Sequence, residues 1–365
     1  MNNPRTLLLV ALFALSYLIW SQWQLDYNPQ AQATTVEDSA TPQPAKPAAS
    51  PPVDDVPEIG KLQSGNAVEA PPLAEATPPT SQPILVTTDV LRVEIDPRGG
   101  SLVSAELLAY PQQQGSSEPV RLLDDEAARY FVAQSGLLSS DGAAPNHQAE
   151  FTTSSRNWTL ANGQNRIEVP LTWQDASGIQ VRKTLVFERG SYVIGMQQQV
   201  RNASAKPWTG QAYRQLQRIP LVLDSSGIKG YTNTERYSFM GAAWYSPEEK
   251  FQKLAFDKFQ GEPLKQTVSG GWVAMLQHYF FAAWIPPANE VDEFSSAQVA
   301  AADGTRYVMR SFSPALSIQP GTEQTFSARL YVGPKLQSTL DDLAPGLSKT
   351  ADYGVFTVIS EPLHW

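Results

Sequence analysis

Few side chains in this sequence are of the types that transfer protons, attack substrates or bind metals. The chain holds no cysteine and three histidines, at positions 147, 278 and 364. The absence of cysteine excludes a thiol nucleophile, thiolate-bound zinc and iron–sulfur clusters. His147 lies in a polar stretch predicted to be a loop, and His278 lies in an aromatic stretch predicted to be a strand. Neither has a ligand spacing such as HxH or HExxH, so we expect no metal, no cofactor and no catalytic residue.

Acidic doublets and glycine pairs are the remaining groups that suggest chemistry. Adjacent carboxylates on a strand point to opposite faces, so the doublets are expected to be solvated surface charge and not a glycosidase pair. The glycine pairs 99–100 and 270–271 are expected to form turns or bulges, because no nucleotide-binding spacing surrounds them. The acidic doublets are Asp124–Asp125, Glu248–Glu249 and Asp341–Asp342. These patterns predict that the protein is not an enzyme.

The overall charge and one aromatic stretch narrow the classes of partner. A net charge of −9 argues against a nucleic-acid partner, which requires a basic face. Large β-sandwiches include carbohydrate-active proteins, and the aromatic stretch Trp272–Trp284 would be able to line a sugar-binding face. An anchored periplasmic carbohydrate-binding or carbohydrate-modifying sandwich is therefore kept as an alternative function.

The N-terminal segment 6–23 is predicted to be a transmembrane anchor helix. It carries no charged side chain, and 18 helical residues at ~1.5 Å each reach roughly 27 Å, close to the hydrocarbon thickness. Arg5 precedes the segment, which places residues 1–5 in the cytoplasm and the remainder outside. The outer aromatic belt would consist of Trp20, Trp23 and Tyr27. A cleaved signal peptide is the alternative, because the sequence AQA at 31–33 has the small-x-small form of a cleavage site.

Residues 24–83 are predicted to be a disordered linker. They carry eight acidic residues against two lysines, and 12 of the 29 prolines lie between positions 28 and 83. No aromatic residue follows Tyr27 within this stretch. Such a segment cannot bury enough apolar surface to offset the entropy of ordering it, and its prolines keep it extended.

Residues 84–334 show the period of two that is typical of β-strands. At Leu91–Asp96, for example, apolar and charged residues alternate before the Pro97–Gly100 turn. Many short strands over about 250 residues, without long helical periods between them, predict an all-β antiparallel sandwich or barrel. The other strands are expected at Ile167–Trp173, Val181–Glu188, Tyr192–Val200, Val273–Trp284, Arg306–Ser311 and Thr325–Val332.

Two segments depart from this β pattern. The sequence SPEE at 246–249 offers an N-cap serine, a first-turn proline and an N3 glutamate, which predicts a short helix. Within 335–352, leucines recur with helical spacing, and Pro345-Gly346 should end or kink the helix. We expect this stripe to pack on the sandwich, with a partner-docking face as the alternative. Its members are Leu336, Leu340, Leu343 and Leu347.

The C-terminal residues 353–365 are apolar and aromatic. This composition belongs at a membrane surface or ahead of a membrane span. We therefore expect the segment to approach a second transmembrane helix that this chain lacks.

Blocks of residues along the whole chain, except the linker, match the pattern of a known family. They include Met1–Arg5, Tyr17–Trp20, Thr88–Leu91, Arg98–Gly100, Ala133–Leu137, Arg189–Tyr192, Gly241–Ala243, Gly270–Gln277, Ala283–Pro286, Val332–Lys335 and Asp352–Gly354. In residues and in order, these blocks resemble the YidC membrane-protein insertases of Gram-negative bacteria, in the YidC/Oxa/Alb family.

The resemblance implies an inner-membrane insertase and chaperone that inserts, folds and assembles membrane proteins, alone or with the Sec translocon. It implies a large periplasmic β-supersandwich, similar in fold to galactose mutarotases, after the first transmembrane helix. In this family, insertion uses a hydrophilic groove with an arginine, formed by later helices. No residue of this chain matches that arginine, so we do not expect the 365-residue form to insert substrates alone.

The resemblance also implies partners and regions of contact. The partners would be the SecD and SecF subunits, SecYEG, nascent membrane proteins and the lipid bilayer. The link to the membrane core would involve Leu336, Leu340, Leu343 and Tyr353. The region implied to contact Sec subunits holds Tyr213, Tyr237, Phe239, Trp244, Tyr245, Phe251 and Phe259.

Overall fold

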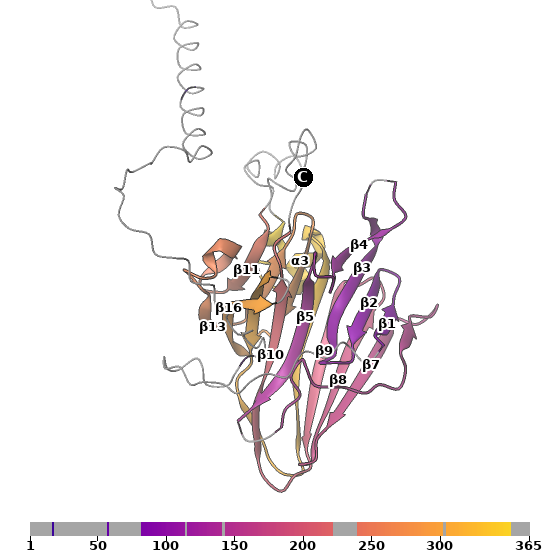
Figure 1. The fold of residues 1–365 in the computed structure, drawn as a ribbon, viewed down its shortest axis with the longest axis vertical. Coiled ribbons are helices and arrows are strands. Elements are labelled where there is room, and N and C mark those ends of the chain that lie inside the picture. The colour runs from indigo at the N-terminus through magenta and orange to yellow at the C-terminus, as the bar shows by residue number, and fades with distance from the viewer. Residues whose placement is uncertain are drawn as a thin grey trace, which may run out of the picture. The chain divides into compact units, whose positions relative to one another are not determined.

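The computed structural model describes Tyr17, Pro57 and residues 82–113, 115–140, 143–221, 239–301 and 304–351. From residue 82 onward, these ranges form two β-sheets packed face to face, together with three short helical segments (Figure 1). The predicted all-β sandwich is therefore confirmed. Apart from Tyr17, Pro57 and residues 82–83, the predicted anchor and linker lie outside the described residues, as do positions 353–365. No helix of the described ranges is long and apolar enough to cross a membrane.

The first sheet contains 11 strands in the part of the chain that the structure describes. All of its pairs are antiparallel except β1 with β6. Two strands lie off the main path: β18 (Leu316–Ile318) pairs with β10, and β4 (Pro119–Leu123) pairs with β3. The path itself runs β13 (Lys265–Ser269), β16 (Val291–Ala301), β17 (Gly304–Phe312), β10 (Trp208–Arg218), β5 (Phe131–Ser139), β3 (Ser101–Pro111), β2 (Leu91–Asp96), β1 (Ile84–Thr87), β6 (Asn157–Thr159).

The second sheet contains eight antiparallel strands within the described ranges. Three helical segments accompany the sheets: η3 (Phe256–Lys258), α3 (Gln337–Leu343) and η4 (Leu347–Thr350). Figure 1 shows α3 at the upper end of the sandwich. The strand order is β12 (Lys250–Leu254), β11 (Gly241–Ser246), β14 (Trp272–Leu276), β15 (Phe280–Ile285), β19 (Glu323–Pro334), β9 (Val193–Asn202), β8 (Ile179–Glu188), β7 (Arg166–Gln174).

The main hydrophobic core fills the space between the two sheets. Alternate residues of each strand enter it, such as Val93 and Ile95 of β2, both fully buried. Trp284 of β15 and Phe294 of β16 are also fully buried there. This alternation is the pattern from which the strands were predicted, and it explains why most strand boundaries agree within two residues.

The predicted single strand Val273–Trp284 is wrong. It is a hairpin in which β14 and β15 pair with each other, as Val273 does with Trp284. All five residues of β14 are buried, so no alternation marks where the chain reverses. His278 consequently lies in the turn between the two strands and not inside a strand.

The predicted helix at 246–249 is also wrong, because these residues form the turn between β11 and β12. The Ser246 hydroxyl accepts a hydrogen bond of 2.8 Å from the backbone N–H of Glu249. That is the bond an N-cap serine makes, so the local chemistry was correctly identified. Lys250 then takes a positive φ of 60° and enters β12, and pairing with β11 prevails over the helix signal.

Both glycine pairs occupy turns, as predicted. Gly99 and Gly100 have φ of 75° and 60°, and Gly270 has φ of 70°. A Cβ atom on Gly99 would lie 2.3 Å from the backbone oxygen of His147, so this position also requires the absence of a side chain.

β7 forms one edge of the eight-stranded sheet. On its side away from β8, an isolated bridge joins Thr172 to Thr152, with N–H···O distances of 2.9 Å and 2.8 Å. Pro170, two residues earlier in β7, has no N–H to donate. The edge is therefore short of free backbone donors.

Candidate functional site

A second hydrophobic cluster lies on the outer face of the eight-stranded sheet, away from the main core. Strands β11, β14, β15 and β19 supply its floor, and α3 and η4 cover it. This explains why β14 and β15 are buried on both faces. The fully or nearly fully buried members are Ala243, Trp272, Ala274, Leu276, Phe281, Ala283, Ile285, Tyr331, Leu340, Ala344 and Leu347.

Two hydrogen bonds hold the helical cover to the sheet at the end of α3. The indole N–H of Trp272 donates to the carbonyl oxygen of Pro345 at 3.0 Å. The guanidinium of Arg329 donates to the carbonyl oxygen of Leu343 at 2.8 Å. Leu343 is the last residue of α3 and Pro345 lies two residues beyond it, so neither carbonyl accepts a hydrogen bond from within the helix. The sheet thus satisfies the helix end and fixes its position.

The predicted leucine stripe packs on the sandwich along most of its length. Leu340 and Leu347 are fully buried in the second cluster, and Leu343 packs against it. Leu336 does not pack on the sandwich with the other leucines, since it is 42% exposed at the N-cap of α3. The helix ends at Leu343, before Pro345 and Gly346, as the sequence predicted.

Gly346 provides a direct test of this packing. It has φ of 70°, and a Cβ atom there would lie 2.5 Å from two ring carbons of Tyr245. Gly346→Ala is expected to lower the free energy of unfolding by about 2–5 kcal/mol, because a left-handed backbone strain of ~1–2 kcal/mol adds to overpacking of ~1–3 kcal/mol. Denaturant unfolding, with hydrogen exchange of residues 344–351, would measure this.

Gly321→Ala is the matched control for that substitution. Gly321 has a similar φ of 78°, but nothing lies within 4 Å of its Cβ position. Only the backbone strain of ~1–2 kcal/mol is expected there. Equal losses in the two variants would show that Tyr245 does not hold the η4 segment in place.

The residues implied to contact Sec subunits do not form one surface. Tyr213, Trp244 and Phe259 are buried, with exposed fractions of 0%, 6% and 2%. Phe239, Tyr245 and Phe251 are partly exposed instead and pack against the second cluster.

The structure brings two separately predicted regions together around Trp272. The Tyr245 ring stacks on Trp272 with a centroid distance of 6.1 Å, and the Phe251 ring lies 6.0 Å from it. The same indole bonds the end of the helical cover, so the partly exposed aromatic residues pack together with the helical segment predicted to link the sandwich to the membrane core. The remaining predicted site residues lie outside the described residues: Arg5, Trp20, Trp23, Tyr27, Tyr237 and Tyr353.

His147 has a structural partner that the sequence did not reveal. Its Nδ1 lies 2.6 Å from the hydroxyl of Tyr213, and its backbone N–H donates to the same oxygen at 2.9 Å. The two residues are 66 positions apart. The contact ties the loop containing His147 to β10, and no pattern in the sequence would indicate it.

Ser135 and Lys183 have the residue types, and lie at the contact distance, of a serine–lysine nucleophile pair. The Ser135 hydroxyl lies 3.0 Å from Nζ of Lys183, and burial lowers the pKa of Lys183 to about 7. Ser135 is 3% exposed and Lys183 is 0% exposed, so a substrate does not reach them. Nζ also donates to the backbone oxygens of Gly99 and Ser135 at 2.6 Å and 2.9 Å. Three acceptors match the three donors of an ammonium, which identifies the pair as a tie between the sheets.

A second buried charged group joins the two sheets at Arg214, which is fully buried. Its guanidinium donates to Asp292 at 2.8 Å, to Glu290 at 3.0 Å and to the backbone oxygen of Ser327 at 3.0 Å. Burial raises the pKa of Asp292 to about 7, and the charge of Arg214 opposes that rise. Ser311 also donates to Asp292.

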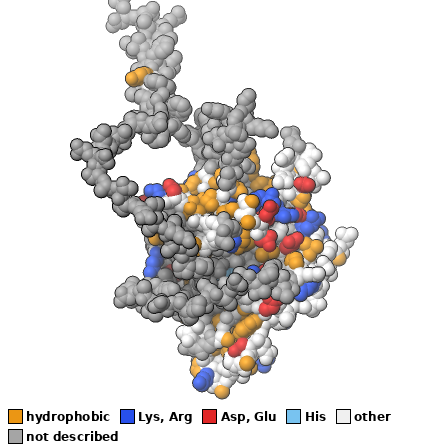
Figure 2. Space-filling view, in the orientation of Figure 1, with side chains coloured by type: hydrophobic (Ala, Val, Ile, Leu, Met, Phe, Trp, Pro, Cys, Tyr) orange, Lys and Arg blue, Asp and Glu red, His pale blue; other side chains and the backbone are white. Residues whose placement is uncertain are grey.

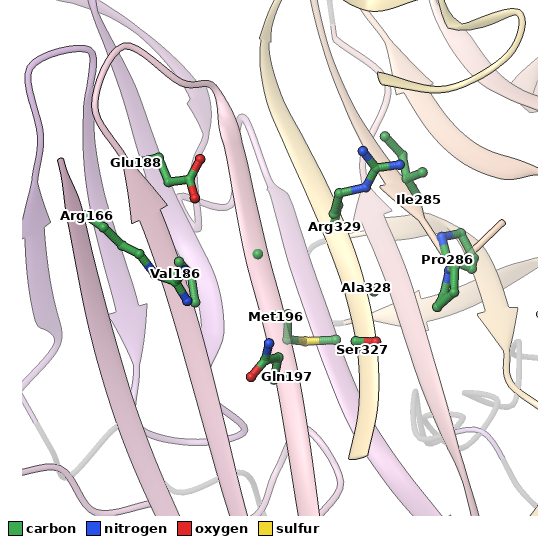
Figure 3. Close-up of a pocket in the computed structure, with 12 residues that line it drawn as sticks. Arg166, Val186, Glu188, Met196, Gln197, Ile285, Pro286, Ser327, Ala328 and Arg329 are labelled. Atoms are coloured by element: carbon green, nitrogen blue, oxygen red, sulfur yellow. The ribbon is translucent and has the colours of Figure 1, made fainter. Parts of the chain in front are cut away.

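One pocket of about 370 Å³ opens on the eight-stranded sheet (Figure 3). Arg166 and Glu188 lie on its side toward β7 and β8, and Arg329 lies on the side of β19. Its lining, which includes Val186 and Ile285, contains no aromatic side chain for stacking on a sugar. It also contains no nucleophile paired with a base, so its chemistry does not support catalysis.

The two tryptophans that suggested a sugar-binding face are buried in the structure. Trp272 and Trp284 are both 0% exposed. Trp272 lies beneath the helical cover, and Trp284 donates its indole N–H to the backbone oxygen of Gln215 at 3.1 Å inside the core. Among the described residues, no group of three or more His, Asp and Glu side chains would hold a metal ion.

Comparison with known proteins identifies the family. Residues 83–365 match the family model described as the YidC periplasmic domain. The chain belongs to the YidC family. It is 40% identical over 369 residues to the membrane protein insertase YidC of Methylococcus capsulatus, and 36% identical over 374 residues to that of Thioalkalivibrio sulfidiphilus. Each alignment covers 100% of this YidC-family chain and 64% of the relative, so the chain spans less than two thirds of their length.

Solved structures with similar folds include galactose mutarotase-like proteins. One is a galactose mutarotase related enzyme from Lactobacillus acidophilus, with a TM-score of 0.43 and 9% identity, covering 69% of the YidC-family chain and 97% of that protein. Another, from Lactobacillus casei, has a TM-score of 0.42 and 10% identity and covers 69% and 100%. These likenesses concern the fold alone.

Proposed function

We propose that this chain is the anchor and periplasmic part of an inner-membrane insertase and chaperone. The observation that carries the proposal is the match over 100% of the chain to relatives named membrane protein insertase YidC. The sandwich itself has no catalytic role in this proposal. Its buried Ser135–Lys183 pair is inaccessible, and the lining of its described pocket holds no nucleophile and base.

The proposed arrangement follows the segments predicted from the sequence. Residues 1–5 are cytoplasmic, 6–23 cross the membrane and 24–83 form the linker. The sandwich, 84–334, then lies in the periplasm, the helical connection spans 335–352, and 353–365 return to the membrane. The two hydrogen bonds at the end of α3 support a rigid connection, because they fix the last helical segments to the sheet.

Phe239, Tyr245 and Phe251 are the proposed contact for a SecD or SecF subunit. They are the described members of the implied contact region that are not buried in the structure. Partly exposed aromatic side chains on a packed base are the residues that most often carry interface energy. The Sec translocon and nascent membrane proteins are the proposed partners of the whole protein.

Depletion of the full-length protein tests the proposed activity. Small single-span membrane proteins are expected to remain uninserted after depletion, as measured by protease accessibility in spheroplasts. Expression of the full-length gene should restore insertion. Normal insertion in depleted cells would contradict the insertase proposal.

Site-directed photo-cross-linking tests the proposed Sec contact. A photoreactive phenylalanine analogue at Phe251 is expected to form adducts with SecD or SecF in the full-length protein. Leu316, which is 37% exposed in β18, is the control position. Adducts of equal yield at both positions would contradict the assignment.

A further inference from the structure

The tip of the β14–β15 hairpin exposes an aromatic side chain beside an exposed leucine. Tyr279 is 57% exposed and Leu336 is 42% exposed, and both are among the few large apolar side chains left in solvent in the described ranges. The backbone N–H of Lys335 donates to the oxygen of Tyr279 at 2.9 Å, so Leu336 follows directly on this contact. We name Tyr279 and Leu336 the apolar tip.

Packed aromatic rings support the apolar tip from below. The Tyr279 and Phe280 ring centroids are 6.4 Å apart, and Phe280 lies 5.5 Å from Tyr110. Tyr110 in turn lies 6.3 Å from Tyr192, which packs against the main core. Because Tyr110 belongs to β3 and Phe280 to β15, this row closes one end of the sandwich between its two sheets. The exposure of Tyr279 is thus built on a fixed base and is not the result of a loose loop.

The apolar tip lies at the end of the sandwich that carries the last described elements. Phe280 pairs with Pro334, the final residue of β19, and α3 begins three residues later. Figure 1 shows α3 at the upper end, and hydrophobic side chains gather on this part of the surface in Figure 2. η4 packs beside α3 and ends at Thr350, three residues before the apolar segment that begins at Tyr353.

Leu316 lies at the opposite end of the sandwich. It pairs with Gly210 near the start of β10. Two residues later, the backbone oxygen of Ile318 accepts a hydrogen bond from the Asn202 side chain, close to the start of β19. The 12 residues of β19 separate this end from the apolar tip, a distance of roughly 36 Å at ~3.3 Å per residue. One end of the sandwich therefore combines exposed tyrosine and leucine with the route toward residues 353–365.

We propose that the apolar tip inserts into the interfacial layer of the lipid bilayer and fixes the orientation of the sandwich relative to the membrane. Tyrosine suits this layer because its ring is apolar and its hydroxyl remains among the headgroups, and leucine adds apolar area to bury. A few residues of chain reach only ~3.6 Å each, so the segment from Thr350 to Tyr353 keeps this end within about 11 Å of residue 353. The inference rests on the proposed function, because it requires that residues 353–365 approach a bilayer.

The absence of cysteine allows a direct measurement of insertion. The variants Tyr279→Cys, Leu316→Cys and Trp20→Cys each provide one site for an environment-sensitive fluorophore such as NBD. The labelled full chain is reconstituted in vesicles of phosphatidylcholine and phosphatidylglycerol, with and without nitroxide-labelled lipids. Quenching at position 279 is expected to lower the emission at least twofold, and quenching at position 316 is expected to be negligible.

The three positions separate failure of this inference from failure of the proposed function. Quenching at position 20 without quenching at position 279 would contradict insertion of the apolar tip but would support the predicted membrane anchor. Absence of quenching at position 20 would instead contradict the anchor on which the proposed function depends. Equal quenching at positions 279 and 316 would also overturn the inference, because it would reflect the fluorophore and not the end of the sandwich.

Discussion

Replacing Arg214 with methionine is expected to lower the free energy of unfolding by about 3–5 kcal/mol at pH 8, as measured by denaturant unfolding of the full chain in detergent. The guanidinium is fully buried and bonds Asp292 at 2.8 Å, and Asp292 is itself 1% exposed. Methionine keeps much of the volume but leaves a buried carboxylate without its cation. The backbone oxygen of Ser327 also loses its donor.

A second variant and a control identify the cause of that loss. Arg214→Met combined with Asp292→Leu removes both buried charges and is expected to recover more than half of the stability. Arg92→Met breaks a pair of similar length, 2.8 Å to Glu106, in which the arginine side chain is 46% exposed, and should cost about 1 kcal/mol or less. Equal losses in the single and the double variant would show that the unpaired charge is not responsible.

The loss in Arg214→Met should also depend on pH. Burial already raises the pKa of Asp292 to about 7, and removal of the neighbouring cation raises it further. In the variant, Asp292 therefore takes up a proton as the pH falls, and a neutral carboxylic acid is less costly to bury than a carboxylate. The destabilisation is expected to be smaller at pH 5 than at pH 8.

Lys183 is expected to make the stability of the protein rise with pH above neutrality. Burial lowers its pKa in the folded chain to about 7, below the ordinary value of 10.5. Between these two pH values, the unfolded chain holds a proton that the folded chain has released. The free energy of unfolding should therefore increase by up to ~1.4 kcal/mol per pH unit from this group, and below pH 7 the contribution is constant.

Lys183→Met should remove that dependence, because methionine fills similar space without titrating. Lys206→Met is the matched control, since Lys206 is exposed in a turn. Urea unfolding at several pH values between 7 and 10 compares the slopes, so other titrating groups cancel. The assignment fails if the wild-type slope survives in Lys183→Met or disappears in Lys206→Met.

The sequence predicted the strands well where one face of a strand is solvated. Leu91–Asp96 alternates between buried and more exposed positions, and its predicted bounds are those of β2. Where both faces are covered the period vanishes, which is why the reversal at His278 was missed. At Ser246, a helix cap and a hairpin turn share the same first hydrogen bond, and only the pairing of β11 with β12 distinguishes them.

The buried charges were missed although the alternation contained a signal for one of them. Val181 and Leu185 face the core, so Lys183 between them occupies an inward position of the predicted strand. A lysine at such a position indicates a buried amine with dedicated acceptors. The acceptors, however, come from Gly99 and Ser135, 84 and 48 residues away, and only the fold reveals them. The same holds for the packing of Tyr245 against Gly346.

The edge of β7 has a consequence for aggregation. In an antiparallel strand, alternate residues direct their backbone groups to the same side, so Pro170 and Thr172 both belong to the row facing away from β8. Pro170 lacks a backbone donor in that row, and the backbone groups of Thr172, the next residue in the row, are already hydrogen-bonded to Thr152. An unfolded segment cannot pair with this part of the row, so this part of the edge resists strand addition and aggregation.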